Sequence, residues 1–121
     1  MSPALLVVDD DPPMRHLLDQ ALTEAGYRVA AVNDGSAAIA MLERRSFRPD
    51  GMIIDLQLGE GPDGYQVARR ARELSPSMAV VYITGGRQNE WRPDWAPDGV
   101  VLLKPFTLEQ MLTVTAEVVQ G

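Results

Sequence analysis

The sequence predicts an α/β protein in which helices cover both faces of a five-stranded parallel sheet, giving three layers. Short apolar runs typical of buried strands alternate along the chain with segments whose apolar residues recur at helical spacing. This alternation favours a parallel sheet because each connecting helix returns the chain over the sheet in a right-handed sense. With 121 residues and 45% hydrophobic content, the chain fits one domain, which we expect to span residues 1–121.

The first expected strand is Ala4–Val8, which forms the continuous apolar run ALLVV. Such a run is typical of a strand that is buried on both faces, whereas a half-exposed strand alternates apolar and polar residues. A shorter strand is expected at Arg28–Val32. Three further apolar strands follow at Met52–Ile54, Met78–Ile83 and Val100–Leu103.

A helix is expected after every strand. The second helix should span Ser36–Arg45, the third should begin near Asp63, and Thr107 should cap the last. A fourth helix should lie within Gly86–Asp98, where two prolines cut it short. The apolar stripe of the first helix comprises Met14, Leu17, Leu18, Ala21, Leu22 and Ala25.

Composition excludes several classes of function. The formal net charge is −6, and no cluster of lysine and arginine offsets it, so a nucleic-acid partner is not expected. No apolar run approaches the ~18–20 residues of a membrane span, and no signal peptide is recognisable. The chain has no cysteine, which is compatible with a reducing compartment. We therefore expect a soluble cytoplasmic protein without a membrane partner.

Three consecutive carboxylates, Asp9, Asp10 and Asp11, follow the first strand directly. Crowded carboxylates raise one another's pKa, because each ionised neighbour disfavours the next charge. Either water screens them in a solvated acidic turn, or a cation lies among them. This stretch alone does not decide between the two interpretations.

The ends of the other strands favour the cation. Ligands of open parallel sheets bind at the carboxyl ends of the strands, and the third strand ends in Asp55 and the fourth in Thr84, while the fifth leads into Lys104. Together with Asp9 and Asp10, these side chains would form an oxygen-rich site with one ammonium beside it. Such a set suits Mg²⁺, which prefers a few carboxylates together with water and phosphate oxygens.

Each of these residues also has a simpler interpretation. Asp55 could cap a loop, but a carboxylate at the end of a buried strand would then be costly. Lys104 is the only lysine in the chain, and it stands where a compact cation is needed. Thr84 could be an ordinary strand-end hydroxyl. His16 is expected to be a surface residue, and Trp91 and Trp95 form either a packed stripe or a partner-docking pair.

These strand-end residues, with the segments around them, resemble the receiver domain of response regulators along the whole chain. The resemblance implies a flavodoxin-like receiver fold with the strand order 2-1-3-4-5. It is carried by five motifs in register, LLVVDDDPPMR, PDGMIIDLQL, PDGYQVARRARE, VVYITGG and VLLKPF.

The resemblance also implies a role for each site residue. Asp55 would accept a phosphoryl group from a histidine kinase or a phosphotransfer protein. Asp10 would bind Mg²⁺ directly, Asp9 partly through water, and the carbonyl of Gln57 would complete the protein ligands. The domain would then be a signalling module rather than an enzyme, and Asp11 would be a spare carboxylate.

The same resemblance, with the residues themselves, assigns the groups that would hold the phosphoryl. The Lys104 ammonium, the Thr84 hydroxyl and the Gly85 backbone N–H are expected to bind its oxygens, since phosphoryl transfer is catalysed mainly by positioning and electrostatic stabilisation. Receivers also usually hold the bond corresponding to Lys104–Pro105 in the cis form.

Two departures from the family pattern bear on signalling. The loop Gly59–Pro62 is one residue longer than usual, and Val101 stands where receivers usually have a switch aromatic. Receivers usually signal through their fourth helix, fifth strand and fifth helix, here the segment 86–98, Val100–Leu103 and the last helix. We expect the Gly85-Gly86 loop and the segment with the two tryptophans to move instead of Val101.

Alternatives remain beside the receiver interpretation. A phosphorylation-independent docking module of the same fold is favoured by Val101 but opposed by the intact acids, threonine and lysine. A phosphohydrolase would need a second acid where Gln57 stands. A nucleotide binder would need a phosphate-cradling turn in place of the acidic turn after the first strand.

Overall fold

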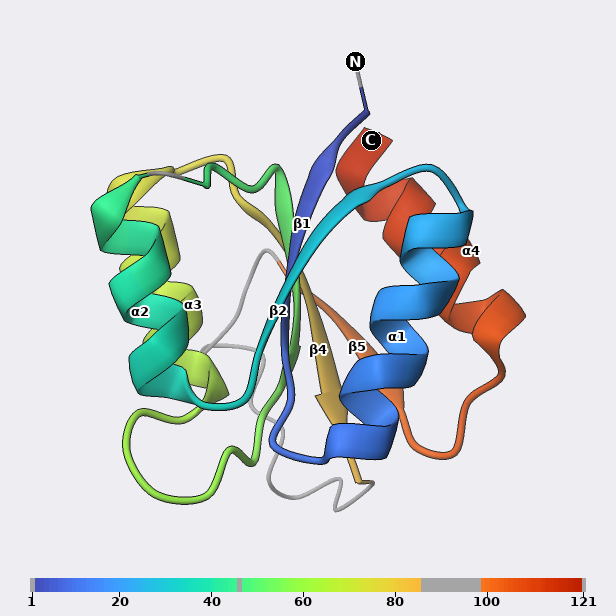
Figure 1. Ribbon diagram of the computed structural model, residues 1–121, viewed down its shortest axis with the longest axis horizontal. Coiled ribbons are helices and arrows are strands. Elements are labelled where there is room, and N and C mark those ends of the chain that lie inside the picture. The colour runs from blue at the N-terminus through green and yellow to red at the C-terminus, as the bar shows by residue number, and fades with distance from the viewer. Residues whose placement is uncertain (1, 46, 86–98, 121) are drawn as a thin grey trace.

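A computed structural model describes residues 2–45, 47–85 and 99–120. The described part contains a five-stranded parallel sheet with two helices on each face (Figure 1). The strands are β1 Ala4–Val8, β2 Arg28–Val32, β3 Gly51–Asp55, β4 Ala79–Thr84 and β5 Gly99–Leu103. The helices are α1 Pro12–Glu24, α2 Gly35–Arg44, α3 Gly64–Leu74 and α4 Leu108–Gln120.

The sheet has the order β2-β1-β3-β4-β5, so the predicted α/β architecture and strand order are confirmed. All four strand pairs are parallel. The chain moves outward from β1 to β2 and then crosses back to β3, so the strand order reverses between β1 and β3. At this reversal the polypeptide leaves the two central strands in opposite directions, which opens a crevice at their carboxyl ends.

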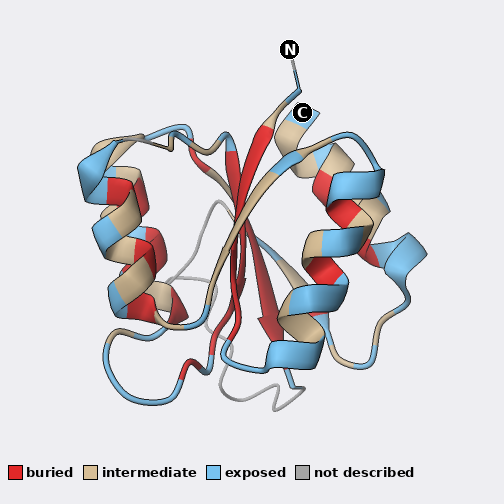
Figure 2. Cartoon of the chain, in the orientation of Figure 1, coloured by how far each residue is buried: buried red, intermediate tan, exposed pale blue. Residues whose placement is uncertain are grey.

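Two apolar layers hold the helices on the sheet because successive strand residues point to opposite faces. Leu6, Met52 and Val80 pack on one face with residues of α2 and α3. Leu5, Ile53 and Val81 pack on the other face with residues of α1 and α4. The central strands are therefore buried on both sides, as their continuous apolar runs predicted (Figure 2).

Capping residues set the beginnings of three helices. The Asp34 carboxylate accepts the Ala37 N–H at the start of α2. Asp63 and Gln66 form a reciprocal capping box at α3. Thr107 caps α4 as predicted, because its hydroxyl accepts the Gln110 N–H at 3.0 Å.

Some details of the first two helices differ from the prediction. Leu17 is 43% exposed and Ala25 is exposed, so the apolar stripe of α1 is narrower than the sequence pattern indicated. α2 begins at Gly35 and ends at Arg44, and Arg45 adopts a left-handed conformation with φ 58° beyond its end. His16 is exposed, as predicted.

The fourth helix expected within 86–98 lies outside the described residues, together with Gly86, Trp91 and Trp95. α4 of the structure is therefore the last helix of the sequence prediction. Val101 is half-buried on β5 and pairs in register with Tyr82 of β4. In the described part of the chain, no helix combines the length and apolar character that crossing a membrane requires.

Candidate functional site

Four of the predicted site residues follow or end parallel strands at one edge of the sheet. Asp9 comes directly after β1, Asp55 is the last residue of β3, Thr84 is the last of β4, and Lys104 follows β5. The Lys104 N–H donates to the Thr84 carbonyl at 2.9 Å, which holds the segment after β5 beside the end of β4. The sheet therefore brings together residues that are far apart in the sequence.

Asp9 is a fully buried carboxylate in this crevice. Its Oδ1 accepts the Asp11 N–H at 2.9 Å, and its backbone carbonyl accepts a hydrogen bond of 3.0 Å from Arg15 Nη1. Its other oxygen, Oδ2, has no hydrogen-bond partner among the described residues. A buried carboxylate oxygen without a donor is costly, and a ligand that supplies positive charge would remove that cost.

The environment of Asp9 also acts on its protonation. Burial raises the pKa of the Asp9 carboxyl, and the nearby charges of Asp55 and Asp10 raise it further, against the lowering effects of the Asp11 N–H and Lys104. The ionised form of Asp9 is therefore the form that the folded protein disfavours. A cation in the crevice would instead favour the ionised form of Asp9.

Asp55 lies beside Asp9, but both of its carboxylate oxygens have hydrogen-bond or ion-pair partners. Its side chain is only 7% exposed. Its Oδ1 accepts the Gln57 N–H at 2.9 Å, and its Oδ2 forms an ion pair with Lys104 Nζ at 2.9 Å. Burial lowers the pKa of Lys104, but its hydrogen bond to Asp55 and the Asp55 charge outweigh that effect, so the net shift is upward. Lys104 is thus a fixed positive charge on the predicted acceptor.

The remaining predicted residues surround this pair. Thr84 is buried, whereas Gly85 and Gln57 are exposed. A Cβ built on Gly85 would meet no atom of the described residues within 4 Å. The peptide bond between Lys104 and Pro105 is cis, as predicted.

Asp9, Asp10 and Asp55 form a cluster that could hold a metal ion. Each offers one carboxylate oxygen, and these three oxygens lie within 4.8 Å of one another. Asp10 is exposed while the other two are buried, so one side of the cluster opens to solvent. Hard oxygen ligands and the unpartnered Asp9 Oδ2 fit Mg²⁺ with some of its waters retained. Asp11 is exposed and does not belong to the cluster.

The loop after β3 passes close to the cluster despite its extra residue. Gly59 has φ +73°, and a Cβ built on it would lie 3.7 Å from Asp10 Oδ2. Leu58 is buried and anchors the loop in the core shared with α2 and α3. At the end of the loop, a Cβ on Gly64 would lie 2.7 Å from the Asp55 carbonyl, so α3 begins directly against the end of β3.

The sequence analysis did not predict a role for Arg15. This residue is half-buried, and its guanidinium fixes the backbone carbonyl of Asp9 from the first turns of α1. The spacing of six residues between them is not a recognisable motif. Only the expectation that α1 begins at the prolines after Asp11 could have placed Arg15 near the acidic turn.

Comparison with known proteins identifies the family. The family model of the response regulator receiver domain matches residues 5–116. The response regulator receiver protein CpdR of Brucella abortus is 36% identical over 110 residues, which are 89% of each chain. The response regulator MprA of Mycobacterium ulcerans is 33% identical over 114 residues, but the match spans only 48% of MprA. The chain therefore belongs to the response regulator receiver domain family.

Solved structures agree with this family. A response regulator receiver protein from Sinorhizobium medicae superimposes with a TM-score of 0.92 at 38% identity, over 99% of this chain and 96% of that one. The receiver domain of the sensor histidine kinase PA1611 from Pseudomonas aeruginosa has a TM-score of 0.84 at 25% identity, with both chains fully covered. That structure carries a magnesium ion in its active-site cleft. Receiver domains are signalling modules of two-component systems.

The buried Asp9 carboxylate generates a stability prediction. In the presence of a chelator, Asp9→Asn should raise the free energy of unfolding by about 1 kcal/mol, because a neutral amide replaces a desolvated charge. The Asn oxygen can still accept the Asp11 N–H, and its amide can donate to the neighbouring carboxylates. Denaturant unfolding with EDTA measures the difference, and Asp11→Asn, at an exposed position, is the matched control with little expected change. A less stable Asp9→Asn protein would show that the ionised carboxylate is not the costly form.

Proposed function

We propose that Asp55 accepts a phosphoryl group from a histidine kinase or a histidine phosphotransfer protein of a two-component phosphorelay. In this step the bond between phosphorus and the donor histidine nitrogen breaks, and a bond forms between phosphorus and an Asp55 carboxylate oxygen. The observation that carries the proposal is the 2.9 Å ion pair between Lys104 and Asp55 in a crevice shared with Asp9 and Asp10. We also propose that residues 1–121 form one receiver domain acting in the cytoplasm.

The groups around Asp55 are suited to bind the negative charge of an incoming phosphoryl group. Lys104 carries a single positive charge and pairs with a phosphoryl oxygen once Asp55 is modified. The Thr84 hydroxyl and the Gly85 N–H, which lie at and directly after the end of β4, would bind the remaining oxygens. The Gln57 N–H holds Asp55 Oδ1 and so fixes the orientation of the carboxylate. These groups act by position and charge, which is the main requirement of phosphoryl transfer.

The acidic cluster provides for a metal cofactor. Asp9, Asp10 and Asp55 with the backbone carbonyl of Gln57 would hold Mg²⁺, with Asp9 acting partly through a water molecule. When bound, the ion neutralises the negative charge of the carboxylates and of the phosphoryl group. Its support in this chain is the buried Asp9 Oδ2, which has no partner within the described ranges.

A downstream protein would bind the face that receivers usually use, of which β5 and α4 are described here, while the predicted helix within 86–98 lies outside the described residues. The described part of this face presents three exposed apolar side chains, Val100 at 39%, Leu103 at 46% and Leu108 at 38%. Val100 and Leu103 lie on β5, the edge strand of the sheet, and Leu108 is the first residue of α4. The proposal includes no nucleic-acid or membrane partner. Phosphorylation would reach this face through the Gly85-Gly86 loop and the following segment.

A phosphorylation-independent docking module is the second candidate. Val101 favours it, because this β-branched residue replaces the usual switch aromatic and has little rotamer freedom or reach. It is already half-buried against the core cluster that contains Tyr82. The exposed apolar residues of β5 and α4 would serve such a module equally well. The two candidates differ in whether Asp55 reacts at all.

The primary test is therefore phosphorylation of Asp55. With Mg²⁺ and acetyl phosphate, the wild-type chain should gain the mass of one phosphoryl group, whereas Asp55→Asn should gain none. Intact mass spectrometry measures both proteins, and Asp11→Asn serves as a control that keeps the label. An unlabelled wild-type chain would favour the docking module, and equal labelling of Asp55→Asn would place the acceptor elsewhere.

Metal binding is tested at Asp10. The wild-type chain should bind Mg²⁺ in the millimolar range or tighter, and Asp10→Ala should abolish measurable binding, because too few protein oxygens remain for an ion that dehydrates reluctantly. Titration calorimetry gives both affinities. Asp11→Asn removes a neighbouring charge without removing a proposed ligand, so it should bind nearly as well as the wild type. Unchanged binding by Asp10→Ala would contradict the ligand set.

Lys104 should couple phosphorylation to structure rather than hold the metal. Lys104→Ala should retain Mg²⁺ affinity or bind more tightly, since it removes a positive charge near the acidic cluster. The same variant should lose most of the backbone amide shifts that beryllofluoride, a phosphoryl mimic, induces outside the immediate shell of Asp55. Lys104→Arg, which retains the charge, should keep part of the response. Full shifts in Lys104→Ala would exclude this role.

A further inference from the structure

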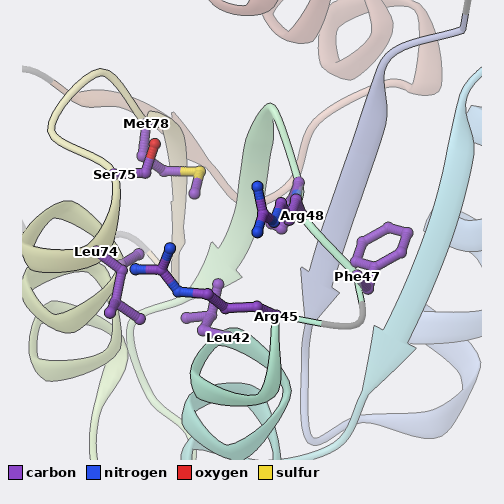
Figure 3. A pocket seen from close by; sticks show the side chains of 9 residues that line it. Leu42, Arg45, Phe47, Arg48, Leu74, Ser75 and Met78 are labelled. Atoms are coloured by element: carbon purple, nitrogen blue, oxygen red, sulfur yellow. The ribbon is translucent and has the colours of Figure 1, made fainter.

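A pocket lies at the end of the sheet opposite to Asp55. It is formed where α2 and α3 end and where the chain enters β3 and β4. Three buried residues, Leu42, Ala71 and Met78, line it together with Leu74. The side chains of Arg45 and Arg48 extend toward the space between Leu74, Leu42 and Met78 (Figure 3).

The two arginines at this pocket are not neutralised. Both are exposed, and neither makes a hydrogen bond or an ion pair within the described part of the chain. By contrast, Arg70 between Glu43 and Glu73 forms two ion pairs and occupies both nearby glutamates. The mouth of the pocket is therefore positive, although the chain has a net charge of −6. Charge complementarity favours an anionic ligand there.

The backbone of Arg45 supports a role beyond structure. With φ 58°, it is the only residue other than glycine with a positive φ in the described ranges. This position follows the last residue of α2, where glycine is the usual choice because it adopts the left-handed conformation without steric cost. An arginine at this point sacrifices stability, and such backbone outliers concentrate at functional sites.

The size of the pocket limits the ligand. Its volume is about 170 Å³. Pockets for cofactors and drug-sized molecules measure roughly 300–1,000 Å³, whereas a cavity of about 150 Å³ holds one benzene molecule. The space therefore fits one apolar side chain. Protein interfaces commonly place a side-chain anchor in a well-packed pocket, and arginine is enriched among the residues that contribute most to binding.

We propose that this pocket binds a short acidic segment of a partner protein. One leucine or phenylalanine side chain of the segment enters the space above Leu42, Ala71 and Met78. Carboxylates that flank this anchor pair with the guanidinium groups of Arg45 and Arg48, whose planar donors suit bidentate contacts. Because the pocket and Asp55 lie at opposite ends of the strands, the partner leaves the acidic crevice open. The proposal does not depend on phosphorylation.

The probe is the N-acetylated, C-amidated pentapeptide Asp-Glu-Leu-Glu-Asp, added to the whole chain and followed by backbone amide shifts. Shifts should concentrate at residues 42–48 and 71–78 and should saturate at millimolar peptide. Arg48→Gln should weaken binding by about threefold or more, as loss of a charge-paired guanidinium implies. Arg69→Gln removes an exposed α3 charge that does not line the pocket, and it should bind like the wild type. A peptide with alanine in place of leucine should lose most of its affinity.

The variant Arg45→Gly distinguishes a loss of peptide affinity from a loss of stability. Glycine suits the left-handed conformation, so the melting temperature should rise while peptide affinity falls by about threefold or more. Unchanged affinity in both arginine variants, or no shifts at millimolar peptide, overturns the proposal. Equal binding of phenylacetate would assign the pocket to small acids instead. Concentration-dependent shifts of the same amides without peptide would assign it to a second copy of the chain, and either outcome rejects the acidic-segment ligand.

Discussion

The site depends on one electrostatic constraint, which is the burial of the Asp9 and Asp55 carboxylates at the carboxyl ends of two apolar strands. Desolvation and mutual repulsion disfavour two ionised groups in such a place. The partly exposed ammonium of Lys104 relieves this repulsion at Asp55 through an ion pair of 2.9 Å. Asp9 has no such cation, and its Oδ2 lacks any donor within the described residues. The crevice therefore has an unmet requirement for positive charge, and a metal ion would supply it.

The fold maintains this unfavourable arrangement because the strands cannot rearrange to relieve it. β1 and β3 are completely buried, and their residues alternate between two separate apolar layers. A shift of either strand by one residue would exchange the two layers and expose polar groups to the core. The Asp9 backbone is fixed further by Val32 and Arg15. The packing of the apolar layers thus holds the two carboxylates in an electrostatically unfavourable arrangement.

The sequence was sufficient to predict the architecture and the convergence of the strand ends, because both depend on hydrophobic pattern and chain direction. The sequence was less reliable at Leu17. Its helical spacing predicted a buried side chain, but the apolar layer between α1 and the sheet does not reach it, and Leu17 is exposed. The sequence could not predict the contact of Arg15 with Asp9 or the left-handed Arg45, since both depend on the three-dimensional path of the chain between elements. The metal-ligand role of the carboxylates was suggested by their place after strands, whereas the orphaned Asp9 Oδ2 required coordinates.

The acidic cluster and the two pocket arginines lie at opposite ends of the sheet, and this separation gives a physical basis for two independent binding events. The carboxyl ends present the acidic cluster, whose negative charge favours cations. The opposite end presents the guanidinium groups of Arg45 and Arg48, which are unpaired among the described residues, beside the apolar lining of the pocket. An acidic segment would be repelled from the first region and attracted to the second, so the charge distribution itself directs each ligand to its own end. Coupling between them would require an element that both ligands bias, and α3 is the described helix that begins against Asp55 and ends at the pocket.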